Sequence, residues 1–359
     1  MLVHICCSVD SHFFLQRLKE DFPDEKLVGY FYDPNIHPYS EYRLRLMDVQ
    51  RSCDILGIEL IEGPYDFKAW MAAVKGLEYE PEKGARCEVC FDRRFEMSAK
   101  KAQQIGEKKM TTTLLVSPKK SQEQLKRTGE KLAKDCGVEF VYVDYRTGGG
   151  TQRQQEEAKR ARLYRQDYCG CMFGLAIQRD QQNMLADELF SPLSGDTLPG
   201  SIEERLALYE KRLALEESGR DYKIVRQKFL NYRLKFGWVK VKKEVVPSFV
   251  LAYSVMKRHY TNGKVEMKIN ELHCFNREEI RFLDLEAFNS LMQYDYPSVK
   301  SIIFNPPTVE EQLQLRQKIG LGLWDLSPII VLEHVPQTKM EIFIDAEQYR
   351  DVREILVPL

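Results

Sequence analysis

Residues 3–32 decide the fold of the first half of this chain, and they read VHICCSVDSHFFLQRLKEDFPDEKLVGYFY. The short apolar run Val3–Cys6 predicts a strand, the longer run Ser11–Lys19 predicts a helix, and Leu27–Tyr32 predicts a second strand. A strand, a helix and a strand in this order indicate two parallel strands joined by a crossover helix. This unit is typical of α/β domains.

The same alternation continues to about residue 175. Further runs predict helices at 39–56, 67–74, 87–105 and 121–135 and strands at 58–61, 112–116 and 140–144. We therefore expect a Rossmann-like α/β domain, in which a parallel sheet has helices on both faces. Ligands of such sheets bind beyond the carboxyl ends of the strands. One rim should therefore carry the loops that follow the strands, which are Cys6-Cys7, Tyr32-Asp33-Pro34, Ser117-Pro118 and Tyr145–Gly150.

A cluster of helix and strand breakers at residues 190–200 predicts a linker between two domains. The first domain is expected at 1–189 and the second at 201–359. Leucines at helical spacing open the second domain and strand-like runs follow, so we expect it to be α+β. Its predicted strands are 249–256, 265–272, 302–304, 329–333 and 340–344, with a hairpin turn at Thr261-Asn262-Gly263.

Charge and hydrophobicity exclude several classes of protein. The 53 Lys and Arg residues against 54 Asp and Glu residues give a net charge of −1, so any nucleic-acid site must be local. The longest uncharged stretch is Val245–Met256, which is shorter than the ~20 residues of a membrane-spanning helix. The start of the chain lacks the basic and apolar regions of a secretory signal. We expect a cytoplasmic protein with no membrane span.

Nine cysteines in a reducing compartment do not indicate a disulfide framework. Six of them form three close pairs, Cys6-Cys7, Cys87-x-x-Cys90 and Cys169-Gly-Cys171. Six soft donors exceed the four of a structural zinc site, and four would hold an iron–sulfur cluster with two to spare. The count favours two metal centres. The unpaired cysteines are expected to be small buried hydrophobic residues, and they are Cys53, Cys136 and Cys274.

Five motifs, three of which contain these pairs, follow in this order: HICCSVD at 4–10, YDPNIHPYSEY at 32–42, RCEVCFDRR at 86–94, TTTLLVSP at 111–118 and YCGC at 168–171. Residues 1–178 thereby resemble the QueH-type epoxyqueuosine reductases. The resemblance implies a HUP-like fold, a 4Fe-4S cluster and an adjacent mononuclear iron held by two cysteines and an aspartate. It also implies reductive removal of the epoxide oxygen from epoxyqueuosine, which gives queuosine. The implied partners are a tRNA with a GUN anticodon and a low-potential electron donor.

The sequence leaves open which cysteines hold the cluster and which hold the lone iron. Asp10, three residues beyond Cys7, is the expected aspartate ligand, and Asp33 is the alternative. Each also has an ordinary explanation, Asp10 as a helix N-cap and Asp33 as a turn residue. The candidate proton donors or base-stacking residues, for which simple packing is the alternative role, are Tyr32, Tyr39 and Tyr42. His37 is a candidate active-site acid, and a loop histidine with ordinary hydrogen bonds is the alternative.

Two segments have the composition of an RNA contact. Gly148-Gly149-Gly150 before a helix from Thr151 resembles a phosphate cradle, and basic residues exceed acidic ones by four between Arg146 and Arg165. In the second domain, Arg220–Lys243 combines nine basic residues, one acid and five aromatic residues, which suits single-stranded RNA. A solvated lysine-rich face is the alternative.

Two other functions compete with the reductase. A noncatalytic RNA-binding protein could use the cysteine pairs to hold structural zinc. A HUP-like nucleotide-activating tRNA-modification enzyme would share the fold, but the sequence contains neither a P-loop nor a GxGxxG motif.

Overall fold

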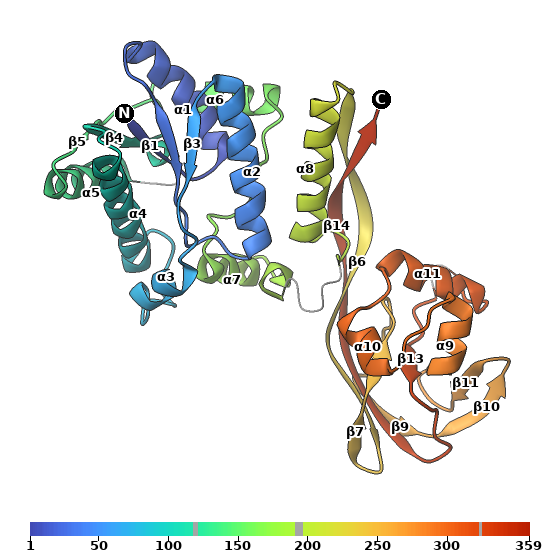
Figure 1. Cartoon of the computed structure of the whole chain (residues 1–359). Coiled ribbons are helices and arrows are strands. Elements are labelled where there is room, and N and C mark those ends of the chain that lie inside the picture. Colours follow the sequence, from blue (N-terminus) through green and yellow to red (C-terminus); the bar gives the residue numbers. More distant parts are fainter. Residues whose placement is uncertain (118–120, 191–196, 323–324) are drawn as a thin grey trace. The chain divides into compact units, whose positions relative to one another are not determined.

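The computed structural model describes residues 1–117, 121–190, 197–322 and 325–359 of the chain. The chain folds into two compact units, Met1–Leu189 and Phe190–Leu359 (Figure 1). Most of the predicted linker, residues 191–196, lies outside the described residues. Among the described residues no helix has the length and apolar character needed to cross a bilayer.

The first unit contains a five-stranded parallel sheet with the strand order β3-β2-β1-β4-β5. The strands are β1 Leu2–Ile5, β2 Val28–Phe31, β3 Glu59–Glu62, β4 Lys109–Thr112 and β5 Glu139–Phe140. The chain moves from β1 outward to β3 and then returns to β4 on the other side of β1. The order therefore reverses between β1 and β4, the position at which a doubly wound sheet opens a crevice for ligands.

Helices cover both faces of this sheet, as the strand and helix pattern predicts (Figure 1). Helices α1, α2 and α6 pack together on one face, and α4 and α5 pack together on the other. The described helices of the unit are α1 Ser8–Asp21, α2 Tyr39–Leu56, α3 Phe67–Ala73, α4 Ala85–Gln104, α5 Gln122–Asp135, α6 Gly150–Arg160 and α7 Met172–Gln181. The Rossmann-like fold class is confirmed.

Two predicted strands of the first unit are wrong in extent. The strand expected at 112–116 ends at Thr112, and the short 3-10 helix η1, Thr113–Val116, follows it. The Thr112 hydroxyl accepts a hydrogen bond from the Leu114 amide at 3.2 Å, which caps η1 and ends the strand. The strand expected at 140–144 is only Glu139–Phe140, and the chain turns further on, where the Asp144 carboxylate accepts the amide of Arg146 at 2.9 Å.

The second unit is α+β, also as predicted, and contains two sheets. One sheet is mixed, with the order β10-β11-β12-β13-β8, and the other is antiparallel, with the order β7-β6-β14-β9. The long strands β6 Tyr222–Val241 and β14 Met340–Pro358 pair along their whole length. The other elements are α8 Ile202–Glu217, β7 Glu244–Val246, β8 Ser248–Val250, β9 Tyr260–Gly263, β10 Val265–Ile269, β11 Leu272–Phe275, β12 Arg281–Asp284, α9 Leu285–Met292, α10 Val299–Phe304, α11 Val309–Lys318 and β13 Ile329–Leu332.

Four predictions for the second unit are wrong. The strand predicted at 265–272 ends at Ile269, and the chain turns there into the antiparallel strand β11. Thr261-Asn262-Gly263 lies within the edge strand β9, where it pairs with β14, and is not a hairpin turn. Residues 302–304 end helix α10, because Ser298 forms a capping box with Ser301 and starts a helix there. The strand predicted at 249–256 is limited to β8, Ser248–Val250.

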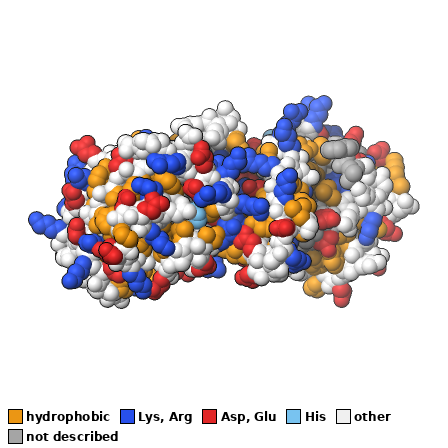
Figure 2. Space-filling view, turned by 90° about the horizontal axis from the view of Figure 1, so that it is seen from above, with side chains coloured by type: hydrophobic (Ala, Val, Ile, Leu, Met, Phe, Trp, Pro, Cys, Tyr) orange, Lys and Arg blue, Asp and Glu red, His pale blue; other side chains and the backbone are white. Residues whose placement is uncertain are grey.

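The surface carries basic and acidic side chains together. Their totals in the sequence are nearly equal, and Figure 2 shows both kinds over the face in view.

Candidate metal centre

A cavity of about 190 Å³ lies in the first unit at the carboxyl ends of the parallel strands. Asp10 and five of the six paired cysteines line it, namely Cys6, Cys87, Cys90, Cys169 and Cys171. Cys7, the sixth, is buried next to Cys6. Side chains from three distant parts of the sequence therefore meet at one place, on the rim where the topology favours a ligand.

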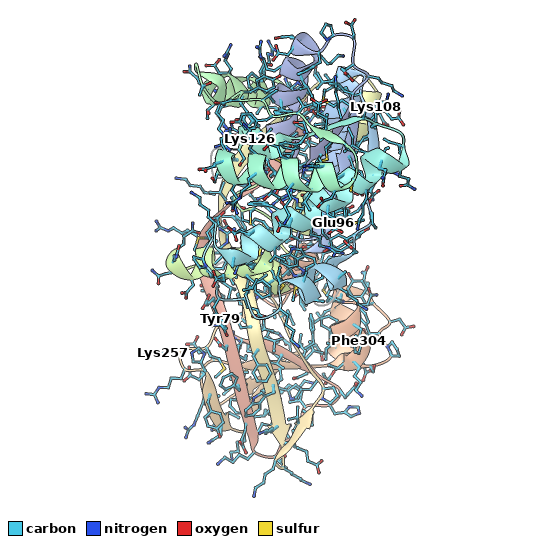
Figure 3. The ribbon with its side chains drawn as sticks, turned by 90° about the vertical axis from the view of Figure 1, so that its left-hand side faces the viewer. Tyr79, Glu96, Lys108, Lys126, Lys257 and Phe304 are labelled. Atoms are coloured by element: carbon cyan, nitrogen blue, oxygen red, sulfur yellow. The ribbon has the colours of Figure 1, made fainter. Side chains whose placement is uncertain are left out.

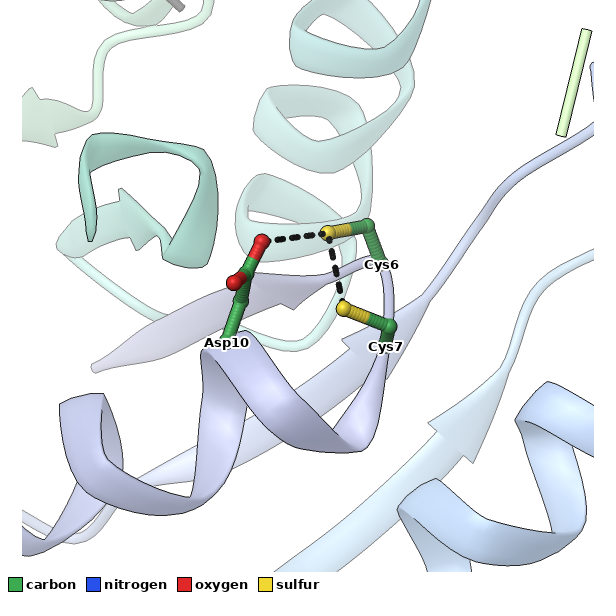
Figure 4. Close-up of side chains that lie close together, drawn as sticks. All are labelled: Cys6, Cys7 and Asp10. Carbon is green, nitrogen blue, oxygen red and sulfur yellow. Dashed lines mark hydrogen bonds between the residues drawn. The ribbon is translucent and has the colours of Figure 1, made fainter. Parts of the chain in front are cut away.

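Cys6, Cys7 and Asp10 form the tightest group of potential metal ligands among the described residues (Figure 4). The Cys6 sulfur lies 3.9 Å from the Cys7 sulfur and 3.8 Å from Oδ2 of Asp10. One ligand atom from each residue falls within 4.8 Å of the other two. Two thiols and a carboxylate at this spacing can bind a single metal ion and leave positions free for a further ligand.

The end of β1 makes this arrangement possible. Adjacent residues of a strand point to opposite faces, but β1 ends at Ile5, and Cys7 is the N-cap residue of α1. Both sulfurs can therefore turn toward one point. Asp10 lies in the first turn of α1 and does not cap it, so the N-cap explanation of Asp10 is wrong. The Cys6 sulfur also lies 3.7 Å from Oγ1 of Thr113, the residue that follows β4.

Gln154 orients the Asp10 carboxylate. Its Nε2 donates to Oδ1 of Asp10 at 2.7 Å, and its side chain is buried on helix α6. The other carboxylate oxygen of Asp10 remains directed at Cys6. Hydrogen bonds of this kind to a ligating carboxylate fix its direction in metal sites. The predicted phosphate cradle, Gly148–Gly150, leads into α6, and its role in binding phosphate stays a prediction.

Cys87 and Cys90 lie in the first two turns of α4. The backbone N–H of Lys83 donates to the Cys87 sulfur at 3.3 Å. Cys90 is buried, and burial raises the pKa of its thiol, whereas Arg94 and the Trp70 indole lower it. The Trp70 Nε1–H is buried without a hydrogen-bond partner of normal geometry among the described residues. It is a donor available to a sulfur acceptor in the cavity.

Cys169 and Cys171 are held by a clamped turn. Gly170 between them has φ = +105°, and a Cβ there would lie 2.8 Å from Cγ1 of Ile36. The buried Arg45 donates to the carbonyls of Tyr168 at 3.0 Å and Cys169 at 3.2 Å. The turn therefore lies close against the segment that follows β2, and only glycine fits at its centre.

Two of the cysteine thiols are buried beside another thiol, an arrangement in which a bound cation would stabilise their thiolate forms. A hydrogen bond to Cys6 and burial raise the pKa of Cys7 well above its usual value. A hydrogen bond to Cys169 and burial likewise raise the pKa of Cys171. Without a cation Cys7 and Cys171 therefore keep their protons, and a bound metal would supply the positive charge that stabilises their thiolates.

Asp33, the alternative ligand, lies elsewhere. It is buried and forms an ion pair with Arg94. Burial raises the pKa of Asp33 to about 6, against the opposing effect of Arg94 and Arg45. Asp33 lies outside the ligand group that contains Cys6 and does not line the cavity.

Tyr32 and His37, the two other residues proposed for the reaction, do not line the cavity either. The Tyr32 hydroxyl donates to Asp66 at 2.9 Å, and the His37 ring stacks on Phe67 with centroids 5.5 Å apart. Tyr39 and Tyr42 stack on each other, and Tyr42 is buried, whereas Tyr39 is 53% exposed. Of the unpaired cysteines, Cys53 is buried in the core, and Cys136 and Cys274 are half-buried.

Several residues of the site carry no recognisable sequence signal as site residues. Gln154, Trp70 and Arg45 are ordinary helix residues in the sequence, and their roles depend on what the folded chain places next to them. Arg94 is a partial exception, because it closes the RCEVCFDRR motif. Despite burial, which lowers it, the pKa of the Arg94 guanidinium is raised by Asp33 and by the Cys90 and Cys6 thiols, so Arg94 lies near both groups of cysteines.

Comparison with known proteins identifies the family. The family model for epoxyqueuosine reductase QueH matches residues 1–176. A relative named epoxyqueuosine reductase QueH from Helicobacter pylori is 41% identical over 96% of this chain and 96% of its own length. Relatives of the same name from Histophilus somni and Thermotoga maritima are 40% and 32% identical, over 49% and 50% of this chain and 72% and 93% of their own lengths.

The relatives differ in how much of this chain they match. The match to the Thermotoga maritima relative covers half of this chain and 93% of that relative's length. The match to the Helicobacter pylori relative covers almost the whole of this chain. The matched family model covers the unit that contains the cysteine-lined cavity and the Cys6, Cys7 and Asp10 group. On the similarity to the Helicobacter pylori relative over nearly its full length, the chain belongs to the epoxyqueuosine reductase QueH family.

Proposed function

We propose that this epoxyqueuosine reductase acts on epoxyqueuosine in tRNA through two neighbouring metal sites. In this proposal Cys87, Cys90, Cys169 and Cys171 hold a 4Fe-4S cluster. Cys6, Cys7 and Asp10 hold a single iron. The convergence of Asp10 and five of the cysteines on one cavity, with Cys7 beside Cys6, is the observation that carries the proposal.

Geometry supports this division of the six cysteines. Cys6 and Cys7 share a compact group with a hard carboxylate oxygen, which is a donor set for one ion. The other four cysteines line the cavity but do not join a group of that compactness among the described residues. An iron–sulfur cluster spreads its four thiolate ligands around a larger body, so the wider spacing suits it.

Removal of the epoxide oxygen takes two electrons and two protons and releases water. A cluster supplies electrons singly, and an iron with an open position supplies a Lewis acid. The chain's own residues position these groups: Gln154 holds the Asp10 carboxylate, and Arg45 holds the turn of Cys169 and Cys171. The buried guanidinium of Arg94 places a fixed positive charge near Cys6 and Cys90, where it offsets the negative charge of thiolates.

The cavity also offers polar groups to a nucleoside. Asn35 and Gln166 line it, and each has a buried amide oxygen without a hydrogen-bond partner among the described residues. These oxygens can accept hydrogen bonds from the hydroxyl or N–H groups of a modified base. Buried acceptors that gain a partner only when substrate binds contribute to both affinity and specificity.

Anaerobic purification tests the proposed metal content. We expect a brown protein with a broad absorption band near ~400 nm and about five irons per chain, four in the cluster and one alone. The protein should convert epoxyqueuosine in tRNA to queuosine with a low-potential reductant. Full activity of a colourless preparation that contains zinc as its only metal would contradict the proposal and favour the zinc-stabilised alternative.

The partners of the reaction belong to the same proposal. The substrate is a tRNA with a GUN anticodon, and a low-potential carrier donates the electrons. We place the reaction in the cytoplasm, where free thiols stay reduced and tRNA is abundant.

A further inference from the structure

The antiparallel sheet of the second unit has one buried face and one exposed face. Val239 on β6 and Met340, Ile342 and Ile344 on β14 belong to the core cluster beneath this sheet. Neighbouring residues of a strand point to opposite faces. The opposite face therefore carries the side chains between them, which include Trp238, Lys240 and Phe343.

An aromatic row crosses three strands of that exposed face. Trp238 on β6, Phe343 on β14 and Tyr260 on β9 are direct register partners. The Trp238 and Phe343 rings stack with an interplanar angle of 13° and centroids 5.8 Å apart. Phe236 packs against Phe343 at 6.0 Å and is 60% exposed, and Tyr260 is 45% exposed. The two ends of the row therefore present ring surface to solvent.

Lysines line the end of the same sheet. Lys242 and Lys243 form the turn after β6, Lys339 precedes β14 and Lys264 follows β9. Met340 pairs with Val241 on one side and Gly263 on the other, so these strand ends share one edge of the sheet. Lys240 places its Nζ 4.3 Å from the centroid of the Trp238 ring. No ion pair joins any of these five lysines to a described acidic residue.

In the folded chain, some residues of the segment Arg220–Lys243 are buried or ion-paired, and others are accessible to a ligand. Tyr222 and Tyr232 are buried, so they cannot stack on a ligand. Lys235 is paired with Asp345 at 3.1 Å and Glu347 at 2.9 Å. Phe236, Trp238 and the lysines at the sheet end remain exposed or half-buried, and β14 and β9 add Phe343 and Tyr260 to them.

We propose that this face, defined by Phe236, Trp238, Phe343, Tyr260 and the lysines at the sheet end, binds unpaired nucleotides of the tRNA substrate. The inference rests on the proposed function for the identity of the RNA. Exposed rings on a sheet stack on bases, and neighbouring cations contact the phosphates between them. Cations without an ion-pair partner among the described residues border the row and outnumber Glu341, the acid on this face that accepts a hydrogen bond from the Tyr260 hydroxyl. A duplex hides its base faces, so the face should favour single strands.

Binding of an unmodified GUN-anticodon tRNA transcript tests the proposal, with its isolated anticodon stem-loop and a blunt duplex of the same stem as further probes. The double variant Phe236→Ala/Tyr260→Ala should weaken stem-loop binding by about ten- to a hundredfold, because each stacked base contributes about tenfold or more. Lys242→Gln/Lys243→Gln should reduce the slope of log affinity against log salt by about 0.7 to 0.9 per lost phosphate contact. Duplex binding should change only with the lysine variant.

Phe304→Ala is the matched control, because Phe304 is 79% exposed at the end of α10 in the same unit (Figure 3). It should bind all probes as the unaltered chain does. Circular dichroism checks the fold of each variant, and Phe236→Ser replaces the double variant if the latter unfolds. Iron content and the rate at saturating tRNA should stay unchanged, whereas the tRNA concentration for half-maximal rate should rise.

Three outcomes overturn the inference. Unchanged stem-loop affinity and salt slope in both variants would show that the face does not bind RNA. Equal losses in Phe304→Ala would show a nonspecific effect. Unchanged RNA binding with a slower rate only when an acidic electron-carrier protein replaces a chemical reductant would assign the face to that protein. Absence of epoxyqueuosine reduction in the unaltered chain would instead contradict the proposed function and leave the binding result standing.

Discussion

Two regions of the molecule are each built on a β-sheet, but on different parts of it. The crevice lies beyond the ends of β1 and β4, and the aromatic row lies on the face formed by β6, β14 and β9. In the crevice, side chains come from a strand end, two helix starts and a tight turn, and each of them is buried or half-buried. In the row they come from strand faces at matched register, and they are exposed at its two ends and half-buried between them. A rim gathers residues that are distant in sequence, whereas a face displays residues in the order set by pairing.

This difference predicts different responses to substitution. Each ligand in the crevice is required for a complete metal site, so its loss should be nearly all-or-none. Each ring or lysine on the exposed face adds a separate increment of affinity, so losses there should be graded. Substitutions in the two regions therefore test the contrast, and we take them in order of decreasing expected effect.

Serine at any paired cysteine should abolish epoxyqueuosine reduction, because one lost thiolate leaves an iron without a ligand. Alanine at Cys136 or Cys274 is the control and should leave iron content and rate unchanged. Cys53→Ala should cost about 1 to 2 kcal/mol of stability and leave the iron content intact. Iron analysis and visible spectra of anaerobic protein measure the effect. Full iron content in a serine variant of the Cys6, Cys7 pair would remove that pair from the ligand set.

Asp10→Asn should lower the iron content from about five to about four per chain and leave the cluster spectrum, if each site binds its metal independently. Gln154→Leu should weaken binding of the lone iron by about ten- to a hundredfold, as the loss of an orienting partner does in other metal sites.

Asp33→Asn is the comparison for Asp10→Asn, since both remove one carboxylate. It should keep all the iron and instead destabilise the unit by about 3 to 5 kcal/mol, because Arg94 loses its buried partner. Thermal unfolding and iron analysis separate the two effects. Loss of the lone iron in Asp33→Asn with retention in Asp10→Asn would exchange the proposed roles.

Gly170→Ala should impair loading of the cluster, because the added Cβ meets Ile36 at 2.8 Å in a backbone conformation that alanine rarely adopts. Gly57→Ala is the control, since its φ of +64° is also positive but nothing lies within 4 Å of the added Cβ. Both should lower the melting temperature slightly, and only the first should lower the cluster absorbance per chain. Equal absorbance in the two variants would show that the turn tolerates a side chain.

Trp238→Phe should have the smallest effect. It keeps an aromatic ring beside Phe343 but reduces the surface over which Lys240 and a base can lie. We expect stem-loop affinity to fall by less than about tenfold, since one ring is reduced and not removed. Iron content should be unchanged, and fluorescence anisotropy with a labelled stem-loop measures the affinity. A change in iron content would contradict the separation of the two sites.

Much of the first unit could be predicted because its signals are local. Short apolar runs separated by helical ones indicated the parallel sheet, and the sheet rule placed Cys6-Cys7 and the loop after β2 on one rim. The strand predicted at 112–116 was wrong because apolar periodicity does not separate a strand from a short 3-10 helix. In that case the Thr112 hydroxyl, and not the apolar pattern, ends the strand.

In the second unit the composition of one segment was informative, but its geometry could not be predicted. Nine cations and five rings in Arg220–Lys243 suggested an RNA contact, but strand alternation and cross-strand pairing decide which of them are exposed. Tyr232 is buried and Lys235 is paired with acids, and neither fact follows from the segment itself. Phe343 and Tyr260 join the face because β14 and β9 pair with each other in the folded sheet.

The fold class, the family and the six paired cysteines could be identified without the structure, because they depend on residue types and on spacings of a few residues. The folded chain was needed to show that Asp10 and not Asp33 lies beside Cys6. Asp33 instead forms an ion pair with Arg94, which lies on a helix about sixty residues later in the sequence. The folded chain was also needed to show that Gln154 reaches Asp10 across the packing of α6 on α1. Hydrogen bonds and ion pairs between distant segments form only after the hydrophobic core has established which elements are neighbours.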